Sequence, residues 1–173
     1  MQLIGQHPEL TLDPRMRMAA RLAECGASEE ELGRLRELLG IRDAWLSRYP
    51  HELSGGELQR FCIARALGAH PSYLIADEVS TMLDAVTQAQ IWRALVAEAE
   101  ARAMGLIFVS HSPALASRLA TRVVELPTVP DVYKRQVHGR GRVVGRRPVG
   151  HGGRGLHLGG AGRGEMCIRD SLR

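Results

Sequence analysis

Apolar and polar positions along the first 126 residues form two alternating patterns. Short continuous apolar runs, typical of buried parallel strands, occur at Gln2 to Ile4, Tyr73 to Ala76 and Leu106 to Val109. The second run ends abruptly in the acidic pair Asp77-Glu78, and we expect this strand to be covered on both faces. A further strand is predicted at Thr121 to Leu126.

Between these runs, apolar residues recur three and four positions apart, which predicts helices. Ser28 is the expected N-cap of one helix, and Gly40 is expected to end it. Alternating strands and helices indicate an α/β fold with a largely parallel sheet, to which residues 7–50 add an α-helical subdomain. The predicted helical stretches are Arg15 to Glu24, Ser28 to Leu39, Gly56 to Leu67, Ala85 to Ala103 and Pro113 to Ala120, and a shorter turn is predicted at Asp43 to Arg48.

Composition separates this part of the chain from its end. Residues 1–126 carry 13 basic and 16 acidic residues, a net charge of −3, whereas residues 127–173 carry 10 and 3, a net charge of +7. The second segment is crowded with Gly and Arg and shows no hydrophobic period, so we predict a disordered or non-native tail. The basic charge therefore says little about the partners of residues 1–126.

Two readings of the tail remain open. Arginines neutralise phosphates without a fold, so the segment could bind nucleic acid. The favoured reading is an artefact, because residues 131–136 (DVYKRQ) and 166–171 (MCIRDS) resemble translated sequencing-adaptor sequence. We therefore expect no nucleic-acid partner.

Apolar runs and cysteine spacing indicate the cellular location of the protein and its redox environment. It has no run of 18 apolar residues and no charged start followed by an apolar stretch, so we expect neither a membrane span nor a secretion signal. Cys25, Cys62 and Cys167 are odd in number and far apart. This spacing favours a reducing cytosol and fits no structural metal site.

The stretch Leu53 to Arg60, Leu-Ser-Gly-Gly-Glu-Leu-Gln-Arg, has the most informative local chemistry. Ser54 and Glu57 have the spacing of a capping box at a helix start. A serine, two glycines and the first free amides of a helix also make a concave site that a phosphate can approach closely. The two interpretations are compatible.

Asp77-Glu78 stands at the end of a predicted parallel strand, where ligands of such sheets collect. A solvated strand end is the plain interpretation. In the functional one, one carboxylate holds Mg²⁺ through water and its neighbour polarises an attacking water molecule. Asp84 is equally open, since its plain interpretation is a helix N-cap.

Leu53 to Arg60 resembles the signature of ATP-binding-cassette (ABC) proteins, and other motifs stand around it in that family's order. They are a Q-loop glutamine at Gln6, a Walker B aspartate at Asp77, a catalytic glutamate at Glu78, a D-loop aspartate at Asp84 within Met82-Leu83-Asp84, and a switch histidine at His111. The stretches at residues 6–10, 49–53 and 88–91 resemble the dipeptide, oligopeptide and nickel importer ATPases.

The resemblance implies a partial P-loop NTPase-like sheet and an ABC-type ATPase that uses ATP and Mg²⁺. By the same resemblance, residues 1–126 form the ABC domain and work as a head-to-tail pair with a second ABC subunit. The pair would lie at the inner face of the cell membrane on permease subunits that receive solute from an external binding protein. Glu78, His111 and Gln6 would be catalytic, and Asp77 and Gln6 would hold Mg²⁺. The residues implied to bind the partner's nucleotide are Leu53, Ser54, Gly55, Gly56, Glu57 and Gln59.

The family's phosphate loop, Gly-x-x-x-x-Gly-Lys-Ser/Thr, is absent from these 173 residues, whose only lysine is Lys134. We expect that loop upstream of Met1 and expect this chain alone to be inactive. A non-transport ABC ATPase of DNA repair or translation is the main alternative. Chromosome-type members have a long coiled coil where Gln6 to Leu53 leaves room only for a compact helical subdomain.

Overall fold

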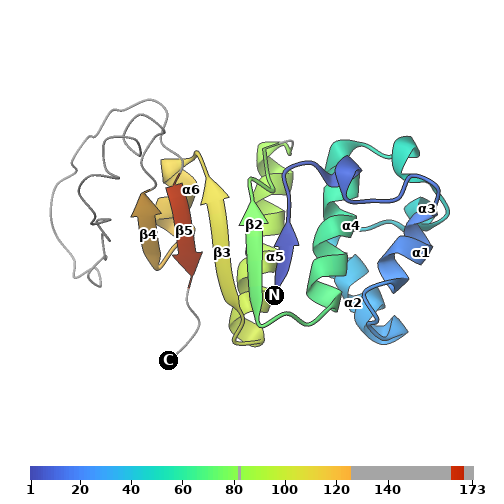
Figure 1. Cartoon of the computed structure of the whole chain (residues 1–173), viewed down its shortest axis with the longest axis horizontal. Helices are drawn as coiled ribbons and strands as arrows, with labels where there is room; N and C mark the ends of the chain where they lie inside the picture. The colour runs from blue at the N-terminus through green and yellow to red at the C-terminus, as the bar shows by residue number, and fades with distance from the viewer. Residues whose placement is uncertain (82, 126–164, 170–173) are drawn as a thin grey trace, which may run out of the picture.

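The fold centres on one five-stranded sheet. The computed structural model describes residues 1–81, 83–125 and 165–169, and the strand order is β1-β2-β3-β5-β4. β1, β2 and β3 run parallel, whereas β5 is antiparallel to both of its neighbours (Figure 1). The strands are β1 Gln2–Ile4, β2 Tyr73–Asp77, β3 Gly105–Ser110, β4 Arg122–Glu125 and β5 Glu165–Arg169.

The helices expected from the sequence are all present, within one to three residues of their predicted limits. Ser28 caps α2 by accepting a hydrogen bond from the Glu31 amide, and Gly40 ends that helix in the left-handed conformation at φ 63°. The α-helices are α1 Met18–Ala23, α2 Glu29–Leu39, α3 Asp43–Leu46, α4 Gly55–Gly68, α5 Ala85–Ala101 and α6 Pro113–Leu119, and the 3-10 helices are η1 Pro8–Leu10 and η2 Pro50–Glu52.

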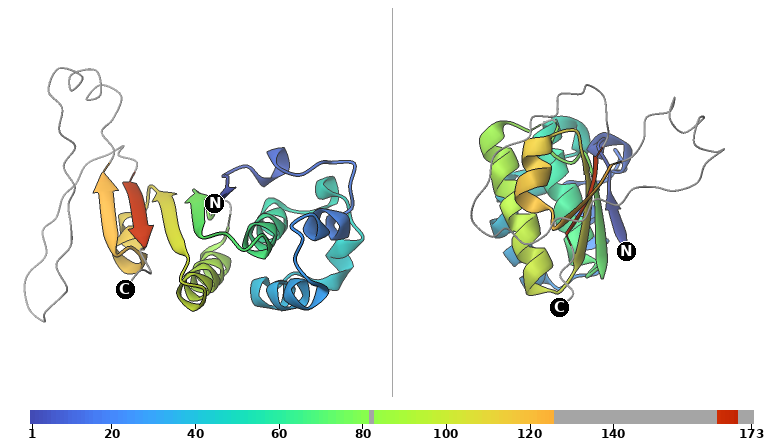
Figure 2. Two further views of the ribbon diagram at one scale, coloured as in Figure 1. Left: turned by 60° about the horizontal axis from the view of Figure 1, so that its bottom comes forward. Right: turned by 90° about the vertical axis from the view of Figure 1, so that its left-hand side faces the viewer.

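The described helices cover one face of the sheet. Figure 2 shows α5 and α6 on the same side of the strands, and burial alternates along β3, where Leu106 and Phe108 are fully buried. The prediction that the strand at 73–76 is covered on both faces is wrong for the part of the chain described: Ile75 is only half-buried and Tyr73 is 48% exposed. Both faces of this strand are apolar, but the described helices reach only one of them.

The sequence predicts no regular element after Leu126, and here the structure differs. Residues 165–169 form β5, which lies between β3 and β4 and pairs with both. An open strand edge presents unpaired amides and carbonyls that any extended segment can pair with, so a local hydrophobic pattern does not reveal such a contact. The rest of the predicted tail lies outside the described residues.

A cluster of four charged residues ties α2 to α5. Arg34 binds Glu98 at 2.6 Å and Glu31 at 2.9 Å, and Arg102 binds Glu98 at 2.7 Å and also contacts Glu31. Glu98 is only 5% exposed, and these arginines supply the partners that a buried carboxylate requires. The Arg34 hydrogen bond lowers the pKa of Glu98 and is the largest of the effects that lower the pKa of Glu31 to about 2.

No helix among the described residues is long and apolar enough to cross a bilayer.

Candidate functional site

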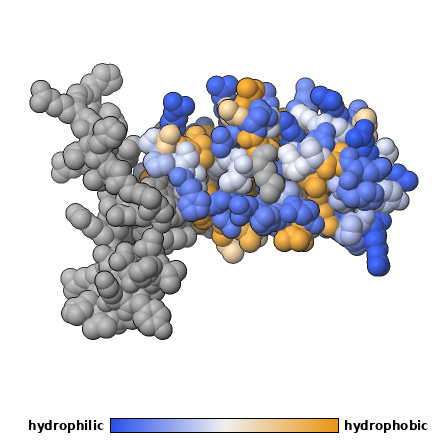
Figure 3. Space-filling model, turned by 90° about the horizontal axis from the view of Figure 1, so that it is seen from above, coloured by the Kyte–Doolittle hydropathy of each residue, from blue (hydrophilic) through white to orange (hydrophobic). Residues whose placement is uncertain are grey.

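The carboxyl ends of β1, β2 and β3 lie at one edge of the sheet (Figure 1). Ile4 is opposite Ala76, and Asp77 is opposite Val109. Because the three strands are parallel and in this register, Gln6, Asp77-Glu78 and His111 all leave the sheet at the same edge. Viewed from above this edge, hydrophilic residues cover much of the described surface (Figure 3).

Glu78 and His111 contact each other at this edge, Glu78 Oε1 against His111 Nε2. The Glu78 side chain is 14% exposed and the His111 side chain 65% exposed, so the pair opens to solvent on the histidine side. Glu78 adopts a left-handed backbone at φ 48°, which is costly for a residue with a side chain and is typical of functional sites. Its amide donates to the Val109 carbonyl at 3.2 Å, and its carbonyl accepts from the Thr81 amide, which fixes this turn. We call Asp77, Glu78 and His111 the acid–imidazole edge.

The loop that follows Glu78 is held by Ser80, a role that the sequence analysis missed. Ser80 is buried, and its Oγ accepts hydrogen bonds from Gln88 Nε2 at 2.8 Å and from Trp92 Nε1 at 3.1 Å. The Trp92 ring packs on Phe108 of β3 at 4.9 Å between ring centroids. A serine two residues after an acidic strand end and a tryptophan in the helix that follows were the visible signals, but only the fold joins them.

Asp77 fits the predicted Mg²⁺ role. Asp77 is exposed at the strand end, one residue before Glu78, and Mg²⁺ is usually bound by one or two carboxylates together with water and phosphate oxygens. Among the described residues, no group of three His, Cys, Asp or Glu side chains forms a metal site. In the part of the chain that the structure describes, no side-chain hydrogen bond joins Gln6 to the acid–imidazole edge, although the register of β1 places Gln6 at the same end of the sheet.

The predicted capping box at Ser54 is present. The Ser54 amide donates to Glu57 Oε2 at 2.8 Å, and the Glu57 amide donates to Ser54 Oγ at 3.3 Å. The two glycines between them, Gly55 and Gly56, begin α4 and are partly exposed. First-turn amides of a helix point away from it along its axis and favour an anion. We call Leu53 to Glu57 the signature turn.

The signature turn and Asp84, the predicted D-loop residue, line one cleft of about 450 Å³. A Cβ on Gly56 would lie 3.0 Å from Leu83 Cδ2, so the glycine permits this close approach. Asp84 caps α5 by accepting from the amides of Val86 and Thr87, each at 3.0 Å, as its plain interpretation predicts. Hydrogen bonding from Thr87 lowers the pKa of Asp84, which favours the charged form of its carboxylate.

Three further residues that the sequence analysis did not single out line this cleft: Arg42, Trp45 and Thr87. Arg42 is the residue before α3 and Trp45 lies within α3, so both precede the signature turn in the chain. Behind the turn, Gln59 is buried and donates from Nε2 to the Gly5 carbonyl at 3.4 Å. This bond links α4 to the segment that carries Gln6.

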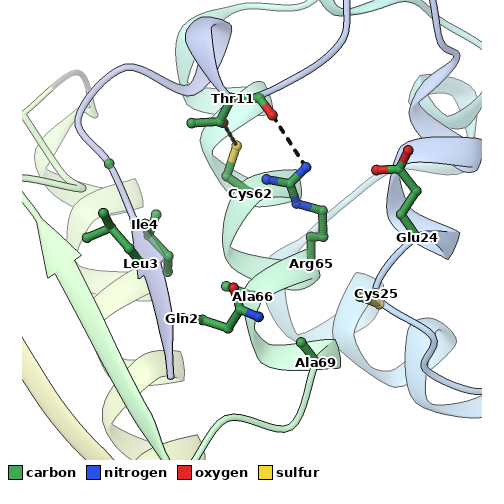
Figure 4. Close-up of a pocket in the computed structure, with 11 residues that line it drawn as sticks. Gln2, Leu3, Ile4, Thr11, Glu24, Cys25, Cys62, Arg65, Ala66 and Ala69 are labelled. Atoms are coloured by element: carbon green, nitrogen blue, oxygen red, sulfur yellow. Dashed lines mark hydrogen bonds between the residues drawn. The ribbon is translucent and has the colours of Figure 1, made fainter.

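A second cavity, of about 360 Å³, lies between β1, α1 and α4 (Figure 4). Cys62 Sγ lies 3.3 Å from Thr11 Oγ1, and Arg65 donates to the Thr11 carbonyl at 3.4 Å. Burial raises the pKa of the Cys62 thiol, which disfavours the reactive thiolate. This cavity contains none of the predicted site residues.

Comparison with known proteins identifies the family of the chain. Residues 1–81 match the family model described as ABC transporter. The chain is 36% identical over 155 residues to the glutathione import ATP-binding protein GsiA of Pectobacterium atrosepticum, a match over 80% of this chain and 25% of GsiA. It is 33% identical over 156 residues to the oligopeptide transport ATP-binding protein OppF of Bacillus subtilis, over 80% of this chain and 51% of OppF. The chain belongs to the ABC transporter ATPase family.

Solved structures support the same ABC fold. The ATP-binding subunit of an ABC transporter superposes with a TM-score of 0.62 at 23% identity, over 81% of this chain and 65% of that one. The ATP-binding cassette MJ0796, in a dimer bound to ADP and Pi, superposes with a TM-score of 0.54 at 22% identity, over 64% of this chain and 53% of that one. This ABC chain spans between a quarter and about half of the curated relatives described above.

Proposed function

We propose that this chain is the signature-bearing part of an ATP-hydrolysing subunit of an ABC importer. The observation that carries the proposal is the contact between Glu78 and His111 at the shared carboxyl edge of β2 and β3. A carboxylate beside an imidazole can orient and deprotonate a water molecule. The separate cleft at the signature turn offers an anion site to a second subunit.

In the proposed reaction, each residue has a simple task. Glu78 accepts a proton from the attacking water, and His111 holds the γ-phosphate and the water in line. Asp77 and Gln6 would hold Mg²⁺, which would neutralise charge on the phosphates. Ser54, Gly55 and Gly56 clamp the γ-phosphate of an ATP held by the partner subunit, so each site needs both subunits.

We further propose that the solute is a peptide. Relatives named for glutathione import and oligopeptide transport support this choice, and the matching stretches at residues 6–10 and 49–53 agree with it. A nickel importer is the second candidate of the same class. Residues 1–126 would form the ABC domain. Within it, residues 7–50 would dock on membrane permease subunits at the cytoplasmic face.

A chimera tests the proposed chemistry. Residues 1–126 would replace the matching segment of Bacillus subtilis OppF, which provides the rest of an ABC subunit. We expect the chimera to hydrolyse ATP in a Mg²⁺-dependent reaction. In the Glu78→Gln variant the rate should fall about 100-fold or more, which is the order of magnitude that the loss of a general base costs. The matched control is Glu30→Gln, an exposed carboxylate in the first turn of α2.

Two results would contradict the proposal. One is a folded chimera, verified by circular dichroism, that hydrolyses ATP equally well with and without Glu78. The other is ATP hydrolysis by the purified 173-residue chain alone, because this sequence contains no phosphate-loop lysine.

A further inference from the structure

The cleft at the signature turn contains two arginines, and they differ in what they already bind. Arg60 donates to the Leu39 carbonyl and to Thr87 Oγ1, so its guanidinium serves the fold. Arg42 lines the same cleft and is exposed, and its guanidinium has no hydrogen-bond or ion-pair partner among the described residues. Its neighbour Asp43 pairs with Arg36 at 3.3 Å and leaves Arg42 unneutralised.

The position of the Arg42 side chain is set by a tryptophan. The guanidinium carbon lies 5.4 Å from the centroid of the Trp45 ring, within the range of a cation–π contact. Trp45 is itself buried and lines the cleft, so it forms a fixed wall against which the arginine rests. A planar cation held in this way loses little side-chain freedom when it binds an anion.

The acidic groups of the cleft do not compete for Arg42. Glu57 accepts the Ser54 amide and the Ser54 hydroxyl, and Asp84 accepts the amides that begin α5. Both carboxylates are therefore occupied with helix N-termini. Arg42 is the cation in this cleft that stays available to a ligand.

We propose that Arg42 is a nucleotide-contacting residue, which binds a phosphate oxygen of the nucleoside triphosphate that a partner subunit presents to the signature turn. The inference rests on the proposed function and deepens it, because it names a cation for a site otherwise made of a serine and backbone amides. Arginine binds phosphate through two parallel hydrogen bonds, which fixes the orientation of the phosphate as well as its charge.

The test uses the 173-residue chain and inorganic tripolyphosphate at constant ionic strength. The chain has two tryptophans, so its indole N–H signals in a ¹⁵N NMR spectrum are two, and the Trp45→Phe variant assigns them. The Gly55 and Gly56 amides report on the signature turn, and the Trp45 indole reports on Arg42. Because Trp92 binds Ser80 elsewhere, its indole is an internal reference.

We expect the two glycine amides and the Trp45 indole to shift together with one affinity. Arg42→Gln should weaken that affinity about tenfold, which is the size of one charge-assisted hydrogen bond, and Arg42→Lys should restore part of it. Arg118→Gln, an exposed arginine of α6, is the matched control and should change nothing. Local signals also separate this site from any binding by the Gly/Arg-rich tail.

Two outcomes would overturn the inference. If the glycine amides shift but Arg42→Gln binds as tightly as the wild type, Arg42 has no such role and the proposed function stands. If no signal near the signature turn shifts in the wild type, Arg42 does not bind phosphate in this chain. The OppF chimera then decides separately whether the proposed function also fails.

Discussion

The signature turn and the acid–imidazole edge are built over very different lengths of chain. Ser54 and Glu57 satisfy each other's amides within four residues. The contact between Glu78 and His111 instead needs two strands in register and a left-handed turn. It also needs a loop latched by Ser80 to α5. A local motif should survive changes in the core, whereas the edge should depend on it.

Truncation of Phe108 should separate the two regions most strongly. Phe108 is fully buried in β3 and packs on Trp92, which in turn binds Ser80. Phe108→Ala should lower the free energy of unfolding by about 3–5 kcal/mol. Urea unfolding followed by circular dichroism measures the loss, and Phe108→Leu should cost much less. If Phe108→Ala changed the amide signals of Ser54 as much as those of Glu78, the result would contradict the separation of the two regions.

Removal of the Ser80 hydroxyl should weaken the acid–imidazole edge and should not create a large cavity. Ser80→Ala leaves the Gln88 amide and the Trp92 indole without their buried acceptor, which should cost about 1–3 kcal/mol. Thr81→Ala is the matched control, because its hydroxyl donates to the Glu78 carbonyl at an exposed position. If both variants unfold at the same urea concentration, the Ser80 hydrogen bonds do not hold the loop against α5.

Loss of the cap at Ser54 should have a smaller and purely local effect. Ser54→Ala should cost about 1 kcal/mol, the usual value of an N-cap. Ser28 also accepts a hydrogen bond from the amide three residues on, at the start of α2, so Ser28→Ala should cost a similar amount by urea unfolding. A much larger loss in Ser54→Ala would mean that the signature turn depends on more than its own residues.

The ion-pair cluster that joins α2 to α5 should give the smallest effect and a defined pH dependence. The folded pKa of Glu31 is about 2, below its ordinary value of 4.5, so its stabilisation is complete above pH 4.5 and shrinks as the pH falls towards 2. The difference in unfolding free energy between wild type and Glu31→Gln should therefore be smaller at about pH 3 than at neutral pH. Glu30→Gln should show no such change, and a difference that grows on acidification would contradict the assignment.

Local pattern was sufficient for much of this protein. Periodicity located five of the six α-helices among the described residues, and Ser28, Ser54 and Asp84 were recognisable as caps, because capping uses atoms only two or three residues apart. The signature, the acidic strand end and His111 also identified the family correctly. These features depend on neighbours in sequence, which a sequence displays directly.

Long-range placement was decided only by the tertiary structure. Nothing local pairs Ser80 with Trp92, brings Arg42 and Trp45 to the signature turn, or inserts β5 between β3 and β4. Such contacts depend on how helices pack and which strand edges stay open, and these are properties of the whole chain. The sequence by itself therefore determined most of the elements and the family, and tertiary packing decided which side chains share a site.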